Sequence, residues 1–293
     1  MIKLIVSDLD GTLLDEYASI SKNNLIALSI LKKQNIEFII ATGRDYQGIE
    51  SIKDKYQLSY EAILGNGAQY VDKYGNVLMN TYLKKEYFKQ IHELLTSHHI
   101  PFYIYTTNGF YTTYEISFVR NEGIKRGVEH KGISAKEYDI GGKYENSPCN
   151  YLKRINNIDE FINSDINIIK FEVFSVNIDS LEKVGSLLNK INGISNLSSF
   201  TDIIEITDQY AQKGYILEKV IESKKLNKNE VVVIGDGMND LSMFELFGYS
   251  FAPSNAIKQI RDMAYKVVEN QYYDGVSKVI SQIILMNNNC KKK

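Results

Sequence analysis

Three short apolar runs rich in valine and isoleucine constrain the fold of this chain more than any other feature. They cover residues 3–7, 37–41 and 230–234, and each has the length and composition of a buried strand. A helical spacing of apolar residues precedes the second run, beginning at a candidate N-cap, Ser21, and a similar spacing precedes the third. Because strands that alternate with helices form parallel sheets, we expect an α/β fold with a Rossmann-like parallel-sheet core and helices on both faces.

Polar residues follow each of these runs directly, at the point where each strand is expected to end. They are Asp8 and Asp10 after the first run, Thr42, Gly43 and Arg44 after the second, and Asp236, Asn239 and Asp240 after the third. The carboxyl ends of parallel strands lie at one edge of a sheet, and ligands bind in the crevice beside that edge. Three segments that are remote in sequence are therefore predicted to meet at one site.

Residues 82–206 have a different pattern. A helix near residues 84–98 leads to a strand at 102–106, an Asn108-Gly109 turn and a second strand at 110–114, which together predict a hairpin. A strand at 168–176, a helix at 179–191 and two short strands before Thr207 repeat this order. We expect a discontinuous core of residues 1–81 and 207–293, and an inserted α+β cap domain of residues 82–206 with an open antiparallel sheet and helices on one face.

Composition argues against several classes of function. Lys and Arg number 34 against 36 Asp and Glu, so the net charge of -2 gives no field that would attract nucleic acid or an anionic membrane. The two cysteines, Cys149 and Cys290, have no metal-ligand spacing, and the sequence shows neither a signal peptide nor a run of transmembrane length. We expect a cytoplasmic protein with no nucleic-acid or membrane partner, and the sequence makes no prediction of oligomeric state.

Asp8 and Asp10 lie two residues apart at a strand end, followed by Gly11, which lets the backbone turn sharply. Two carboxylates this close repel each other unless a cation lies between them. With Asp236 added from another strand, their oxygens suit a hard cation that also keeps water and substrate phosphate as ligands, which is the behaviour of Mg²⁺. The histidine or cysteine ligands that zinc prefers are not part of this pattern.

A metal beside a carboxylate suggests phosphoryl transfer through an aspartyl-phosphate, which divides one difficult displacement into two easier ones. Asp8 is the predicted nucleophile, and Asp10 is the predicted general acid and base. Thr42 and the backbone at Gly43 are candidates for binding the phosphate oxygens, and Lys213 is a candidate for a fixed positive charge beside Asp8 and the phosphate.

Four segments in this order resemble the motifs of the haloacid dehalogenase-like phosphatase superfamily. The matching segments are residues 8–13 (DLDGTL), Thr42, Lys213 with Gly214, and residues 235–240 (GDGMND). The large insert falls between the second and third motifs, as in the C2 (C2B-like) cap class, and residues 65–68 (GNGA), 254–256 (SNA) and 274–276 (DGV) resemble the Cof-type branch. Residues 207–212 depart from the shorter link usual in that branch, which puts the local hinge geometry in question but not the chemistry.

The resemblance implies Mg²⁺ held by Asp8, the backbone carbonyl of Asp10 and Asp236, with Asn239 and Asp240 in support. It also implies a cap that closes over the core, excludes water and selects the leaving group. Candidates for substrate contact lie in the first cap hairpin, although alternate strand residues face opposite sides of a sheet, so half of them must face away. These candidates are Tyr103, Tyr105, Thr107 and Tyr111.

The sequence therefore predicts a magnesium-dependent phosphatase that acts on a small phosphorylated metabolite, such as a sugar phosphate or a phosphorylated cofactor. Asp10 favours rapid hydrolysis, because phosphoryl-storing ATPases of the superfamily carry threonine at that position. Two alternatives stay open: a phosphomutase, which returns the phosphoryl group to a sugar, and a catalytically silent homologue that regulates or binds.

Overall fold

The computed structural model describes residues 1–132, 134–138, 147–197, 201–270 and 274–291. The chain forms two compact units, a core unit of Met1–Asn80 with Gln212–Lys293 and a cap unit of Thr81–Ala211. The second boundary falls later than the expected 206/207, because strand β11 (Ile203–Asp208) pairs within the cap sheet and Thr207 Oγ1 donates a hydrogen bond to the carbonyl of Ala211. No helix among the described residues is long and apolar enough to span a bilayer.

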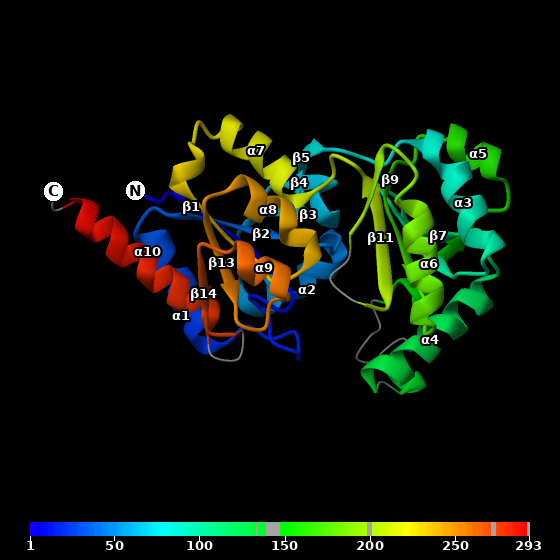
Figure 1. Ribbon diagram of the computed structural model, residues 1–293, viewed down its shortest axis with the longest axis horizontal. Helices are drawn as coiled ribbons and strands as arrows, with labels where there is room; N and C mark the ends of the chain where they lie inside the picture. The colour runs from blue at the N-terminus through cyan, green and yellow to red at the C-terminus, as the bar shows by residue number, and fades with distance from the viewer. Residues whose placement is uncertain (133, 139–146, 198–200, 271–273, 292–293) are drawn as a thin grey trace. The chain divides into compact units, whose positions relative to one another are not determined.

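The core unit is built on an eight-stranded sheet with the order β14-β13-β12-β1-β2-β3-β4-β5 (Figure 1). Six strands are parallel: β1 (Leu4–Asp8), β2 (Glu37–Ala41), β3 (Glu61–Leu64), β12 (Val231–Ile234), β13 (Tyr249–Pro253) and β14 (Lys266–Val268). Strands β4 (Gln69–Val71) and β5 (Val77–Asn80) extend the sheet in antiparallel fashion. The three apolar runs of the sequence are thus adjacent central strands, and the Rossmann-like parallel core is confirmed.

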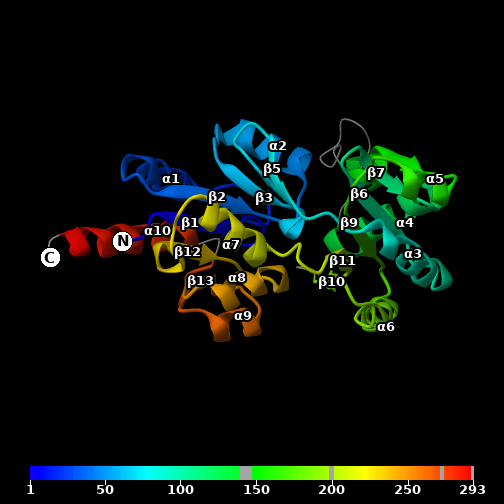
Figure 2. The same cartoon turned by 90° about the horizontal axis from the view of Figure 1, so that it is seen from above.

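Alternate strand residues fill two separate hydrophobic layers, one on each face of this sheet. Ile5 and Ile40 pack with α1 (Lys22–Lys33), α2 (Tyr46–Tyr56) and α10 (Gly275–Lys291), whereas Val6 and Ile39 pack with α7 (Lys213–Ser223), α8 (Leu241–Leu246) and α9 (Lys258–Met263). Figure 2 shows α1 and α2 on one side of the sheet and α8 and α9 on the other. Strands covered on both faces account for the continuous apolar runs.

The cap unit has a six-stranded sheet of its own, with the order β10-β11-β9-β6-β7-β8. Its other strands are β6 (Phe102–Thr106), β7 (Gly109–Thr112), β8 (Leu152–Arg154), β9 (Ile168–Phe174) and β10 (Ile194–Asn196). The pairs are antiparallel except β7 with β8, which the sequence did not predict. Helices α3 (Phe88–Ser97), α5 (Ile158–Asn163) and α6 (Ile178–Leu188) pack on one face.

Helix α4 (Ile116–Lys131) is an addition that corrects the expectation of helices on one face only. A Cβ atom at Gly123 of this helix would lie 2.6 Å from the hydroxyl of Tyr103, which is on the sheet face opposite α3 and α6. The short 3₁₀ turns of the chain are Gly65–Gly67, Lys85–Tyr87, Ala135–Tyr138, Pro148–Asn150, Lys228–Glu230 and Met238–Asp240.

Candidate active site

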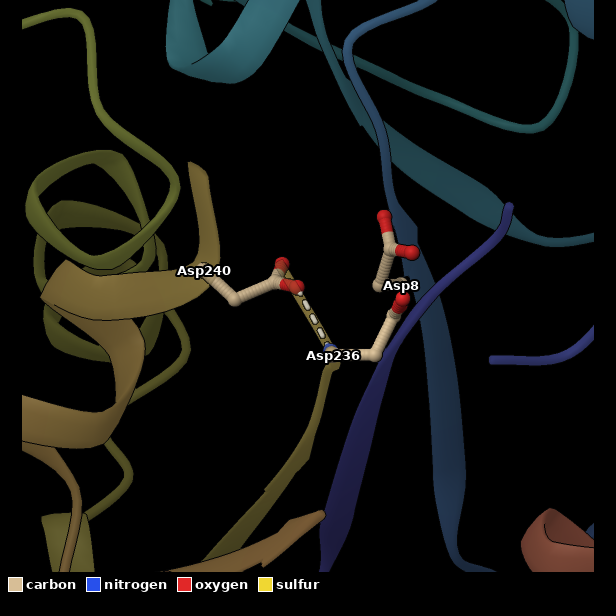
Figure 3. Close-up of side chains that lie close together, drawn as sticks. All are labelled: Asp8, Asp236 and Asp240. Carbon is tan, nitrogen blue, oxygen red and sulfur yellow. Dashed lines mark hydrogen bonds between the residues drawn. The ribbon is translucent and has the colours of Figure 1, made fainter. Parts of the chain in front are cut away.

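Three aspartates gather at the carboxyl edge of the core sheet. Asp8 is the last residue of β1, Asp236 follows β12, and Asp240 ends the 3₁₀ turn that leads into α8. One carboxylate oxygen from each lies within 4.8 Å of the others. Figure 3 shows the three side chains close together. Strands β1 and β12 pair in parallel, Ser7 opposite Ile234, so the residues that follow them emerge at one edge. The structure therefore brings together two segments that are remote in sequence.

Lys213 is the first residue of α7, and its side chain is completely buried. Its Nζ lies 2.5 Å from Asp8 Oδ1 and 2.7 Å from Asp240 Oδ1, so one ammonium bridges two carboxylates. Burial alone would lower the pKa of Lys213, but the carboxylates of Asp240 and Asp8 outweigh it and hold the pKa above its ordinary value. Lys213 is therefore a permanent positive charge against Asp8.

Asp240 and Asp236 have different surroundings. Asp240 Oδ2 accepts hydrogen bonds from the backbone N–H groups of Asp236 at 2.9 Å and Gly237 at 3.0 Å, so both of its oxygens are in use. Asp236 Oδ1 accepts the hydroxyl of Thr12 at 2.6 Å, and a Cβ atom at Gly11 would lie 2.5 Å from its other oxygen. Asp240 thus stabilises the loop that carries Asp236, and glycine at position 11 leaves space beside the Asp236 carboxylate.

The cluster of Asp8, Asp236, Asp240 and Lys213 carries more negative than positive charge. Burial raises the pKa of Asp8 well above its ordinary range; Lys213 opposes that rise, whereas Asp240, Asp236 and Asp10 add to it. Burial and Asp240 likewise raise the pKa of Asp236 to about 6. Three carboxylates surround one ammonium, and a divalent cation would remove the excess negative charge and restore the ionised form of both aspartates.

Asn239 supplies a second observation that fits a hydrated cation. Its Nδ2 donates to Asn66 Oδ1 at 3.1 Å, whereas its Oδ1 is buried and has no hydrogen-bond partner within the described residues. A buried acceptor without a donor is costly, and a metal-bound water is a strong donor. Carboxylate and amide oxygens are also the donors that Mg²⁺ prefers, so the residues present fit this ion.

Thr42 lies directly after β2, almost fully buried, and Gly43 follows it half-buried. The hydroxyl of Thr42 accepts the backbone N–H of Arg44 at 3.2 Å, which leaves its hydrogen to donate to another acceptor. The backbone of Thr42 is held on both sides, by the carbonyl of Ile63 and by the N–H of Asn66. This loop therefore presents one hydroxyl donor from a fixed backbone.

Asp10 differs from the other predicted acidic residues, because its side chain is not part of the aspartate cluster. Arg44 donates from Nε to Asp10 Oδ2 at 2.8 Å and from Nη2 to Asp10 Oδ1 at 2.6 Å. Each carboxylate oxygen therefore accepts one hydrogen bond from the guanidinium and keeps a second lone pair. The resemblance predicts the backbone carbonyl of Asp10, and not its side chain, as a metal ligand, and the position of the side chain agrees with that prediction.

Reasoning from sequence gave no role to Thr12, Asn66 or Arg44, although all three contact predicted site residues. Each lies inside a segment that the sequence analysis had already selected as a motif, and that position in a motif was the feature that could have indicated a role. The turn that contains Asn66 also restricts which residues it can hold. Asn66 has a positive φ of 58°, and a Cβ atom at Gly67 would lie 2.6 Å from the backbone of Gln212.

The four cap candidates do not share one surface. Tyr103 and Tyr105 are buried and lie on the sheet face opposite the hydrophobic layer of the cap unit, whereas Tyr111 packs into that layer, with its ring centroid 5.4 Å from that of Phe161. Thr107 is exposed, and its hydroxyl accepts the N–H of Asn167 at 3.1 Å. The structure thus groups Tyr103 with Tyr105 and separates Tyr111 from them.

A parallel α/β sheet with a lysine between two aspartates at its carboxyl edge and an inserted α+β unit defines a class of hydrolase. Residues 5–280 match the family model described as haloacid dehalogenase-like hydrolase, and the chain belongs to this family. It is thereby an enzyme, and the expected superfamily is confirmed.

Relatives of similar length agree with this assignment. A 5-amino-6-(5-phospho-D-ribitylamino)uracil phosphatase of Bacillus subtilis is 27% identical and aligns with 97% of this chain and 98% of its own. A second Bacillus subtilis phosphatase is 25% identical, over 97% of this chain and 100% of its own.

Solved structures share the fold. A haloacid dehalogenase-like hydrolase from B. subtilis superposes with a TM-score of 0.81 at 24% identity, covering 96% of this chain and 99% of that one. A sugar phosphatase of haloacid dehalogenase subclass IIB gives a TM-score of 0.73 at 18% identity, covering 96% and 98%.

Proposed function

We propose that this chain is a magnesium-dependent phosphatase that hydrolyses a small phosphorylated metabolite through an aspartyl-phosphate on Asp8. The observation that carries the proposal is the position of Lys213, which is fully buried between Asp8 and Asp240 at the carboxyl edge of the sheet. The phosphatase names of the relatives support the same reaction class.

In the first step an oxygen of Asp8 attacks phosphorus, and the ester P–O bond breaks as the new bond forms. The leaving oxygen takes a proton from Asp10, which acts as general acid. In the second step water attacks the same phosphorus and gives a proton to the Asp10 carboxylate; the bond to Asp8 then breaks and inorganic phosphate leaves. Asp8 is restored as a carboxylate and Asp10 as an acid, so the cycle is closed.

The surrounding residues hold the reactants. Lys213 favours the ionised form of Asp8 and opposes the negative charge of the transferring group, and Thr42 with the backbone at Gly43 donates hydrogen bonds to its oxygens. When bound, Mg²⁺ would be held by Asp8, the Asp10 carbonyl and Asp236, with Asn239 and Asp240 in support, and would neutralise charge among the carboxylates and the phosphate. Substrate selection falls to the cap unit, where Tyr103 and Tyr105 are the candidates and Tyr111 is not.

The test is phosphate release from p-nitrophenyl phosphate and from a panel of sugar phosphates, phosphorylated cofactors and phosphoribityl compounds, with Mg²⁺ or with EDTA. We expect turnover that requires Mg²⁺ and is lost in Asp8→Asn but not in Asp262→Asn, an exposed aspartate of the same unit. A sugar bisphosphate that is converted to its isomer without phosphate release would instead indicate a phosphomutase. A folded protein that releases no phosphate from any ester would support the silent homologue and refute the proposal.

A further inference from the structure

Arg44 lies beside the site, in the loop after β2, and no step described so far uses it. Its guanidinium binds both oxygens of Asp10, with Nε–Oδ2 at 2.8 Å and Nη2–Oδ1 at 2.6 Å. This two-point geometry fixes the plane and position of the carboxyl group as well as its charge. Lysine, which has a single ammonium, cannot reproduce it.

The pair is partly exposed, which limits what it adds to stability. The side chains of Arg44 and Asp10 are 30% and 34% exposed, and exposed ion pairs contribute about 0–1 kcal/mol, bidentate arginine–carboxylate pairs being those that contribute most. Two parallel hydrogen bonds also fix the orientation of the carboxyl group, which a contribution to folding would not require.

Further hydrogen bonds hold the side chain and the backbone of Arg44 in place. Its third donor, Nη1, binds the carbonyl of Gly48 at 3.0 Å, and the backbone carbonyl of Arg44 accepts the N–H of Gly65 at 2.9 Å. A Cβ atom at Gly48 would lie 3.2 Å from Cβ of Arg44 and 3.0 Å from Oδ1 of Asp45, so glycine leaves room for the arginine stem. The same loop carries Thr42, whose hydroxyl is predicted to bind phosphate. Arg44 therefore links the Asp10 carboxyl group to this loop.

We propose that Arg44 is the positioning residue for Asp10, which holds the Asp10 carboxyl group where it exchanges protons with the leaving oxygen and with the attacking water. This inference rests on the proposed function. Displacement of a catalytic group by about 1 Å can slow a reaction on the order of 10²-fold. An Asp10 side chain without its guanidinium partner would rotate and lose that much of its effect.

The test compares leaving groups, because only a poor leaving group needs a proton from Asp10. The kcat/KM of a series of aryl phosphates, from p-nitrophenyl phosphate to phenyl phosphate, reports on the steps up to transfer onto Asp8. In Arg44→Ala we expect kcat/KM to fall less than about tenfold for p-nitrophenyl phosphate and about 100-fold for phenyl phosphate. The dependence of kcat/KM on the leaving-group pKa should then approach the dependence seen in Asp10→Asn. Guanidinium ion added to the assay should restore part of the Arg44→Ala activity and none of the Asp10→Asn activity.

Two further variants complete the design. Arg44→Lys keeps the charge and should show the same steeper dependence, and it carries the test if Arg44→Ala does not fold. Arg261→Ala removes an arginine of the same unit that donates to the carbonyls of Ser254 and Ala256, and it should match the wild type across the series.

An equal fall of kcat/KM across all aryl phosphates would overturn the proposal, since the guanidinium would then act on the transferring phosphate itself. Unchanged kinetics in both Arg44 variants would overturn it too. A wild-type protein that releases no phosphate with Mg²⁺ present would refute the proposed function itself, and this result is seen in the same assay before any variant is compared.

Discussion

Lys213 in the core unit and Lys170 in the cap unit are both buried lysines that lie between two carboxylates. Lys213 bridges Asp8 and Asp240, whereas Lys170 lies 3.2 Å from Glu172 and also pairs with Glu205. Burial opposes the charge of each ammonium, and in both cases the neighbouring carboxylates raise the pKa above its ordinary value. The two sites are therefore alike in their immediate electrostatics.

The two lysine sites differ in the residues around the lysine and its two carboxylates. Beside Lys213 there is a third carboxylate, Asp236, and a buried Asn239 oxygen with no partner among the described residues, so the cluster has two negative charges in excess. Beside Lys170 the next neighbour is the ring of Tyr105, whose centroid is 4.4 Å from Nζ, and the excess is one. We infer that the larger surplus of negative charge beside Lys213 favours a site for a cation, whereas the aromatic ring that covers Lys170 favours a role in packing.

The largest difference should appear in turnover. Lys213→Met removes the fixed charge beside Asp8, and we expect kcat for p-nitrophenyl phosphate to fall on the order of 10⁴-fold, or about 5 kcal/mol. Lys170→Met should remain within about tenfold of the wild type at a temperature where both variants are folded. Steady-state assays with Mg²⁺ measure this contrast, and a comparable loss in Lys170→Met would place the cap lysine in the chemistry.

In the cap unit the loss of the lysine should affect stability and not turnover. Lys170→Met leaves the buried Glu205 and the partly buried Glu172 without their partner, and we expect the free energy of unfolding to fall by about 3 kcal/mol. Replacing the whole group, with Lys170→Met, Glu172→Gln and Glu205→Gln combined, should recover most of that loss. Urea unfolding followed by circular dichroism, with hydrogen exchange of the β9 and β11 amides, measures both; equal losses in the two variants would contradict an unpaired-charge origin.

The convergence of Asp8 and Asp236 could be predicted from sequence because it follows from chain topology alone. Parallel strands must place their carboxyl ends at one edge, so residues after β1, β2 and β12 meet whatever their loops do. The pairing of Asp10 with Arg44 could not be predicted in this way, since it depends on side-chain direction within a turn. The hydrogen bond of Thr12 to Asp236 depends on loop conformation in the same manner.

Two of the strands that sequence reasoning missed are short and depend on tertiary pairing. Strands β4 and β8 have three residues each, too few for a periodic signal, and they form because a neighbouring edge is available. The alternation of strand residues implied that the cap candidates would divide between two faces. Only the structure assigns Tyr103 and Tyr105 to one face and Tyr111, on β7, to the other.

The pH dependence of stability should also separate the two lysine sites. In EDTA, burial raises the pKa of Asp236 to about 6 in the folded core, above the ordinary value of 3.8. The folded state then binds this proton more tightly than the unfolded state, so stability is greatest at low pH and falls as the pH rises from about 4 to about 6. We expect a loss on the order of 2 kcal/mol that is absent in Asp236→Asn.

At the cap site stability also falls as the pH rises, because the pKa is again raised in the folded state, but the loss lies in a much higher pH range. The raised pKa of Lys170 means that its contribution is present below its ordinary value of 10.5 and is lost only as the pH rises above it. Thermal melts in EDTA between pH 4 and pH 8 test the core, and the combined variant Lys170→Met, Glu172→Gln and Glu205→Gln, which leaves no unpaired carboxylate in the cap site, should keep that profile unchanged in shape. A profile that stays flat in the wild type would contradict the excess of charge around Asp8 and Asp236.

The smallest expected effect tests whether the ring of Tyr105 completes the cap site. Tyr105→Leu removes the aromatic face above Lys170 Nζ and should cost about 1 kcal/mol more than Tyr105→Phe, which keeps the ring and loses only the hydroxyl. In a double-mutant cycle this difference should vanish when Lys170 is already methionine, because the ring then has no cation to attract. If the difference persisted in the Lys170→Met background, the ring would act by filling space, and the contrast between the two lysines would rest on the surplus charge around Lys213 alone.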